Sequence, residues 1–199
     1  MDASPATGPN RDGAGRSFIE PTPGFDVSAA GSCAAQADAA NLLTGAVVIP
    51  ERHTARGDEH RRMLDKQAAG CSFFVSQVLY DSAAAKNLVS DYRDHCDAHG
   101  VRPLPIVFTL SVCGSLKTLE FLDWLGVEVP RWMQRDLQRS NDTLGASLEH
   151  SRAVGLDVLR YCRRLRVPVG LNVESVSSRR VEIEAAIQLA TGLRSALGG

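Results

Sequence analysis

The chain has 199 residues, with 22 basic and 23 acidic side chains and a formal net charge of -1. This balanced charge provides no basic field, so nucleic-acid binding is not expected. Apolar residues make up 44% of the chain, which suits a packed core, but no apolar run reaches the roughly 20 residues of a membrane helix. The N-terminal residues contain no secretory apolar region, and we therefore expect a cytoplasmic protein without membrane contact.

Residues 1–44 differ in composition from the rest of the chain. Prolines and glycines recur throughout this stretch and interrupt any helix or strand period. A Pro/Gly/Ala-rich stretch of this kind buries little apolar surface, and we predict that it is mobile. The folded unit is predicted to cover residues 45–199.

From Gly45 onward, short apolar runs alternate with longer amphipathic segments. This alternation is typical of βα units, in which helices connect the parallel strands of one sheet. We predict strands over 45–49, 72–76, 104–110 and 168–174. Helices are predicted over 57–69, 82–99, 115–125, 130–139, 144–166 and 178–196.

Polar side chains follow or end the predicted strands. Glu51 and His53 come directly after the first strand, and Gln77 follows the second. In the last strand Asn172 and Glu174 alternate, so both side chains lie on the same side. Ligand sites in parallel βα folds lie at the carboxyl ends of the strands. We therefore expect these side chains to gather at one end of the sheet.

Several short motifs occur in a recognisable order along residues 45–199. They are PERH after the first strand, Lys66 in the following helix, FFVSQ in the second strand, GVEVPRW and Arg179. In this order they resemble the methylenetetrahydrofolate reductase family. The segment FTLSVCGSLKTLEFLDWLGVEVPRW is similar to a divergent actinobacterial-type branch of that family.

The resemblance implies an α/β fold, the (β/α)8 TIM barrel, of which the chain matches only the C-terminal half. Four βα units make a half-barrel, whose four parallel strands we expect to lie in sequence order. A complete barrel has eight units and typically about 250 residues. A half-barrel leaves two strand edges open and exposes its inner face, predicted around Val48, Phe74 and Val107. We therefore expect a homo-oligomer, most simply a two-fold dimer that closes the sheet.

The family binds FAD at the carboxyl end of its barrel, and the resemblance implies three cofactor-binding residues. His53 matches the flavin-binding histidine, and Lys66 matches the lysine near the flavin phosphates. Glu59, or its neighbour Asp58, matches the acidic residue. Ile49 replaces the tyrosine that stacks on the flavin in the family. NADH or NADPH would supply the hydride.

The resemblance also implies a folate substrate. Gln77 matches a substrate-binding position, and Arg179, or the adjacent Arg180, matches another. Glu174 joins them because an inward carboxylate near a strand end calls for a polar ligand. Thr118 replaces a further substrate-binding glutamine. The catalytic acid of the family lies in the pattern F-E-x-x-P-P, which FIEPTP matches in part, so Glu20 is the candidate acid.

The expected function is reduction of 5,10-methylenetetrahydrofolate to 5-methyltetrahydrofolate with NAD(P)H, by a complete or a truncated enzyme. One alternative is a catalytically silent half-barrel that acts as an assembly or partner subunit. Another is a different barrel enzyme that uses Glu51, His53 and Glu174 for acid–base chemistry. The five cysteines have no C-x-x-C spacing, and no metal centre is expected from them.

Overall fold

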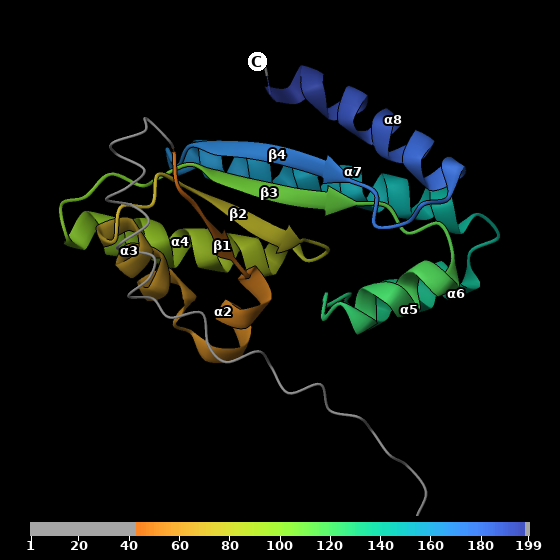
Figure 1. Cartoon of the computed structure of the whole chain (residues 1–199), viewed down its shortest axis with the longest axis horizontal. Helices are drawn as coiled ribbons and strands as arrows, with labels where there is room; N and C mark the ends of the chain where they lie inside the picture. Colours follow the sequence, from red (N-terminus) through yellow and green to blue (C-terminus); the bar gives the residue numbers. More distant parts are fainter. Residues whose placement is uncertain (1–42, 198–199) are drawn as a thin grey trace, which may run out of the picture.

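Strands and helices alternate along residues 43–197, the part of the chain that the computed structural model describes (Figure 1). The strands are β1 (Gly45–Val48), β2 (Phe73–Val78), β3 (Ile106–Ser111) and β4 (Val169–Glu174). The helices are α2 (Pro50–Arg56), α3 (Glu59–Ala68), α4 (Ser82–Ala98), α5 (Leu116–Trp124), α6 (Arg131–Arg139), α7 (Thr143–Arg164) and α8 (Arg180–Leu197). None of these helices is long and apolar enough to cross a membrane. The segment predicted to be mobile lies outside the described residues, apart from residues 43 and 44.

The four strands are parallel and lie in the sheet in sequence order, β1-β2-β3-β4. The predicted direction and order are therefore confirmed. The predicted (β/α)8 TIM-barrel fold is wrong, because the sheet ends at β1 and β4 and does not close within residues 43–197. Closure of that barrel requires eight strands. The described part is an open α/β sheet that is only half-barrel-like.

A short helix, α2, lies where the sequence pattern predicts a polar loop. Pro50 stands at its start, where proline is favoured because its fixed φ suits the first helical turn. Gly57 ends the helix with a φ of 70°, and its N–H donates to His53 O at 2.7 Å. Residues two apart on a helix face different directions. Glu51 and His53 therefore point to different places.

One face of the sheet is buried beneath α4 and α7 (Figure 1). Phe74, Ile106 and Phe108 on the two central strands are fully buried in this core. Helix α7 approaches β3 closely at Gly155, where a Cβ atom would lie only 2.7 Å from Leu110 Cδ1. Because side chains alternate along a strand, this core fixes which residues of each strand face away from the helices.

The opposite face of the sheet, here named the open face, carries Val47, Val75, Val107, Asn172 and Glu174. The parallel register aligns the three valines across β1, β2 and β3. Val47 is 61% exposed. Of the residues predicted for this face, Val48 and Phe74 are instead fully buried beneath the helices. On β1 and β2 the predicted residues stand one position away from those on the open face. A step of one position along a strand reverses the face on which a side chain lies.

A second apolar cluster joins α5 and α6 to the carboxyl ends of β2 and β3. It includes Tyr80 and Cys113, which follow the strands, and Leu122 and Met133 from the two helices. Figure 1 shows α5 and α6 apart from the layer that α4 and α7 form. The two helices therefore form a wall beside the edge at which the strands end.

We expect the open face to be covered by a second copy of the chain in solution, because its row of valines leaves apolar surface exposed. Val47→Glu should shift the sedimentation coefficient from that of a dimer to that of a monomer at micromolar concentration. Ile187→Glu is the matched control, since Ile187 is also 61% exposed but lies on α8. A wild-type chain that sediments as a monomer would contradict this expectation.

Candidate functional site

Polar residues gather where the four strands end, a region here named the carboxyl edge and formed by residues 49–51, 77–81, 111–118 and 174–182. Gln77 Nε2 donates to Gly126 O at 3.4 Å, in the connection between α5 and α6. Asn172 Nδ2 donates to Glu174 Oε2 at 3.3 Å, so these two side chains form a pair on the open face. The predicted substrate residues Gln77 and Glu174 both lie at this edge.

Glu51 is a buried carboxyl group of the carboxyl edge. The residue is 8% exposed, and its Oε1 has no hydrogen-bond partner among the described residues. Burial, supported by the nearby charges of Glu128 and Asp81, raises the pKa of Glu51 to about 7. A carboxyl group with this pKa can accept or donate a proton near neutral pH.

Tyr80 supplies a second buried polar atom at the same edge. The residue is 1% exposed, and its Oη has no hydrogen-bond partner within residues 43–197. The His150 ring stacks on the Tyr80 ring, and His150 Nε2 lies 2.9 Å from Tyr80 O. Buried polar atoms are nearly always hydrogen-bonded, so Glu51 Oε1 and Tyr80 Oη mark positions for a water molecule or a ligand.

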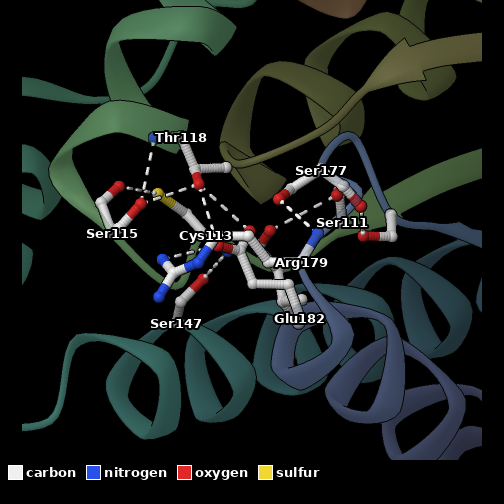
Figure 2. A network of polar contacts seen from close by, with 10 residues as sticks. Ser111, Cys113, Ser115, Thr118, Ser147, Ser177, Arg179 and Glu182 are labelled. Carbon is white, nitrogen blue, oxygen red and sulfur yellow. Dashed lines mark hydrogen bonds and ion pairs between the residues drawn. The ribbon is translucent and has the colours of Figure 1, made fainter.

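A chain of hydrogen bonds joins the start of α5 to the start of α8 (Figure 2). Ser115 Oγ and Thr118 Oγ1 lie 2.9 Å apart, and Thr118 Oγ1 donates to Glu182 Oε1 at 2.9 Å. Arg179 Nη1 donates to the same Glu182 oxygen at 3.2 Å. Glu182 is fully buried, so these donors compensate for the removal of its charge from water. The network holds the Arg179 guanidinium in a defined position.

The loop after β3 can approach Glu182 because residue 114 is glycine. A Cβ atom at Gly114 would lie only 2.6 Å from Glu182 Cγ. The preceding residue, Cys113, donates its N–H to Ser147 Oγ at 2.8 Å. Burial raises the pKa of the Cys113 thiol to about 11. This raised pKa favours the protonated thiol at neutral pH.

An open cleft of about 730 Å³ lies beside this network, between the start of α5 and the connection from β4 to α8. It is lined by the hydroxyl groups of Ser115 and Ser177, the Phe121 ring and the Arg179 side chain, among others. The adjacent Arg180 donates from Nε to Glu184 Oε1 at 2.7 Å on the surface. The cleft thus combines a cation, hydroxyl groups and an aromatic ring at a volume typical of small-molecule sites.

Two of the predicted cofactor-binding residues, Glu59 and Lys66, lie on α3 beside β1. Glu59 is fully buried, and its carboxylate lies 3.4 Å from Arg52, 3.6 Å from Arg62 and 3.7 Å from Lys66. Lys66 Nζ also donates to Val47 O at 2.6 Å. The Lys66 hydrogen bond attaches α3 to β1, and the Arg52 contact attaches α3 to α2.

The third predicted cofactor-binding residue, His53, lies between helices. Its Nε2 atom is 3.0 Å from Asp91 Oδ2 on α4, and the side chain is 4% exposed. His53, Glu59 and Lys66 all have charged partners within the protein, and Ile49 offers no aromatic face. As arranged, these residues do not fit a flavin. The candidate acid Glu20 lies outside the described residues.

Sequence reasoning missed Glu182 as a member of the site. The spacing Arg-x-x-Glu over residues 179–182 could have indicated that Arg179 and Glu182 pair, because residues three apart on a helix are neighbours. Ser115 and Thr118 have the same spacing, and Ser115 caps α5 by accepting the Thr118 N–H. The bond between Thr118 and Glu182 joins residues 64 positions apart, so no local pattern could reveal it.

The raised pKa of Glu51 predicts that folding stability depends on pH. Between the ordinary value of 4.5 and about 7, the folded chain binds more protons than the unfolded chain. The free energy of unfolding should therefore fall as the pH rises through this range, by up to about 3 kcal/mol. Urea unfolding at about pH 5 and about pH 8 measures the fall.

Glu51→Gln carries no titratable group, so it should remove this fall. Glu120→Gln, at an exposed position of α5, should leave the fall unchanged. Equal pH dependence in the wild type and in Glu51→Gln would contradict the assignment.

No protein-family model and no curated protein matches the sequence. Among solved structures, an uncharacterized protein from Clostridium thermocellum is similar, with 44% sequence identity and a TM-score of 0.74. The alignment covers 78% of this chain and 54% of that protein, so the chain spans about half of its length. That protein binds two copies of 5-methyl-5,6,7,8-tetrahydrofolic acid. The comparisons thus show similarity to a folate-binding protein, and membership of the methylenetetrahydrofolate reductase family stays a prediction.

Proposed function

We propose that the chain binds a reduced folate at the carboxyl edge of its sheet. The observation that carries the proposal is the 44% identity, over 78% of this chain, with a protein that binds 5-methyl-5,6,7,8-tetrahydrofolic acid. The motif resemblance to a folate enzyme supports the same class of ligand. Ligands of open parallel sheets bind outside the carboxyl ends of the strands, where the polar residues of this chain gather.

The side chains of the carboxyl edge match the chemistry of a reduced folate. The glutamate tail of folate carries carboxylates, for which the Arg179 guanidinium is a suitable partner. The Phe121 ring, 41% exposed, can pack against an aromatic part of the ligand. Gln77 and Glu174 supply an amide and a carboxylate for the donors and acceptors of the pteridine ring.

Arg179→Ala should weaken the binding of 5-methyltetrahydrofolate by about 10- to 100-fold, because a hydrogen bond to a charged group is lost. Isothermal titration calorimetry measures this change, and circular dichroism checks that the variant is folded. Arg180→Ala is the matched control, since Arg180 is 90% exposed and pairs with Glu184. Equal loss of affinity in both variants would contradict a specific role for Arg179.

Gln77→Ala tests, by the same calorimetric titration, whether the end of β2 also contacts the folate. The loss should be about 1–3 kcal/mol, the cost of leaving buried polar partners unpaired. Gln188→Ala, at an exposed position of α8, should bind as the wild type does. If the wild type does not bind 5-methyltetrahydrofolate, the proposed function is wrong.

Reduction of 5,10-methylenetetrahydrofolate with NADH or NADPH is a narrower proposal. Opening the methylene-bridged ring requires a proton donor, and Glu51, with its pKa of about 7, supports that role. The residues expected to hold FAD have other partners and do not fit it, so no step through a flavin is proposed. The alternative is a folate-binding subunit without catalytic activity.

Oxidation of NADH or NADPH in the presence of 5,10-methylenetetrahydrofolate, followed by nicotinamide absorbance, separates these two possibilities. If Glu51 is the proton donor, Glu51→Gln should lower kcat by at least about 100-fold and leave folate affinity nearly unchanged. Glu120→Gln should retain the wild-type rate. Folate binding without any oxidation of either nicotinamide would exclude the reductase and favour the non-catalytic subunit.

A further inference from the structure

A cluster of metal-ligating side chains lies in the helical layer next to β1. His53 on α2, His60 on α3 and Asp91 on α4 place one ligand atom each within 4.8 Å of one another. His53 Nε2 is 3.0 Å from Asp91 Oδ2. The His53 and His60 ring centroids are 5.1 Å apart, with the rings nearly perpendicular.

Two imidazole nitrogens of this cluster are buried and have no partner. His53 is 5% exposed and His60 is 9% exposed. Neither His53 Nδ1 nor His60 Nδ1 has a hydrogen-bond partner among residues 43–197. A simple ion pair between His53 and Asp91 would not explain why His60 is buried beside it with an unsatisfied nitrogen, because such atoms normally find partners.

We propose that His53, His60 and Asp91 bind a divalent transition-metal ion, with Zn²⁺ as the best match. Two imidazoles and a carboxylate are the ligand types that zinc accepts, and the absence of a thiolate does not disfavour it. Zinc–ligand bonds of about 2.0–2.1 Å in tetrahedral geometry place neighbouring ligand atoms about 3.3 Å apart. The separation of 3.0 Å between His53 Nε2 and Asp91 Oδ2 is close to that value, and all the ligand atoms lie within 4.8 Å of one another. The Asp91 side chain is half-exposed and has room to move toward the ion.

His95 is the natural candidate for a fourth ligand. It lies one turn after Asp91 on α4, on the same side of the helix. Its ring centroid is 5.2 Å from that of His60. A water molecule could instead complete the site, as in zinc sites with three protein ligands.

The site would add a metal-mediated connection to three helices that already meet through packing and through the His53–Asp91 and Arg52–Glu59 ion pairs. A metal ion there would fix α2 against α3 and α4, and α2 also carries Glu51 at the carboxyl edge. Binding of the ion to the folded chain would therefore add to its stability. This site is independent of the proposed folate binding, because none of its ligands belongs to the carboxyl edge.

The test uses the full chain, freed of metal by a chelator and dialysed. Titration with Zn²⁺ should show one site per chain by calorimetry, and Zn²⁺ should raise the Tm. Co²⁺ should give the d–d absorption bands of a low-coordinate site. Asp91→Asn and His60→Gln should each weaken Zn²⁺ binding by more than about tenfold and lose the rise in Tm. Asp94→Asn, at an exposed position of α4, should behave as the wild type.

A purely structural cluster gives a different set of results. Its variants would change the Tm in the presence of chelator, but Zn²⁺ would not raise the Tm of the wild type. Absence of Co²⁺ bands from the wild-type chain would overturn the proposal even if the variants failed to fold. Retention of stoichiometric Zn²⁺ binding by Asp91→Asn and His60→Gln would overturn the assignment of these ligands.

Discussion

Burial of one face of the parallel sheet against α4 and α7 determines where the polar groups at the strand ends lie. Phe74, Ile106 and Phe108 are fully buried in that contact, and the alternation of side chains turns their neighbours outward. Because all four strands run in one direction, their carboxyl ends meet at one edge. The segments that follow the four strands thus bring Glu51, Tyr80 and the network around Glu182 to the same side of the molecule.

Helix α2 divides the polar residues that follow β1 between two environments. Glu51 lies at the carboxyl edge, in surroundings that favour its protonated form. His53 lies between α3 and α4, next to His60 and Asp91. Two residues that stand two positions apart in the PERH motif therefore lie in different chemical surroundings. The same reasoning explains why a histidine matched to a flavin site by its position in PERH does not have flavin-binding surroundings.

Much of the fold could be predicted from the sequence, because short apolar runs indicate buried strands and long amphipathic segments indicate helices. The strand order followed from the βα alternation. Three features could not be predicted. The seven-residue α2 is too short to show a helical period. A shift of one residue along a strand reverses which side chains face outward, and the number of strands in the pattern does not decide whether the sheet closes. At the site, Gln77, Glu174 and Arg179 were named from sequence, whereas Glu182 needs a tertiary contact to be recognised.

Hydrogen–deuterium exchange with and without 5-methyltetrahydrofolate tests the central claim most directly. Binding at the carboxyl edge should slow exchange in residues 111–118 and 174–182, which line the cleft and its network. Exchange in α3, around the contacts of Glu59 with its basic neighbours, should remain unchanged. Protection confined to α3, or no protection by the ligand anywhere in residues 43–197, would contradict the placement of the folate site.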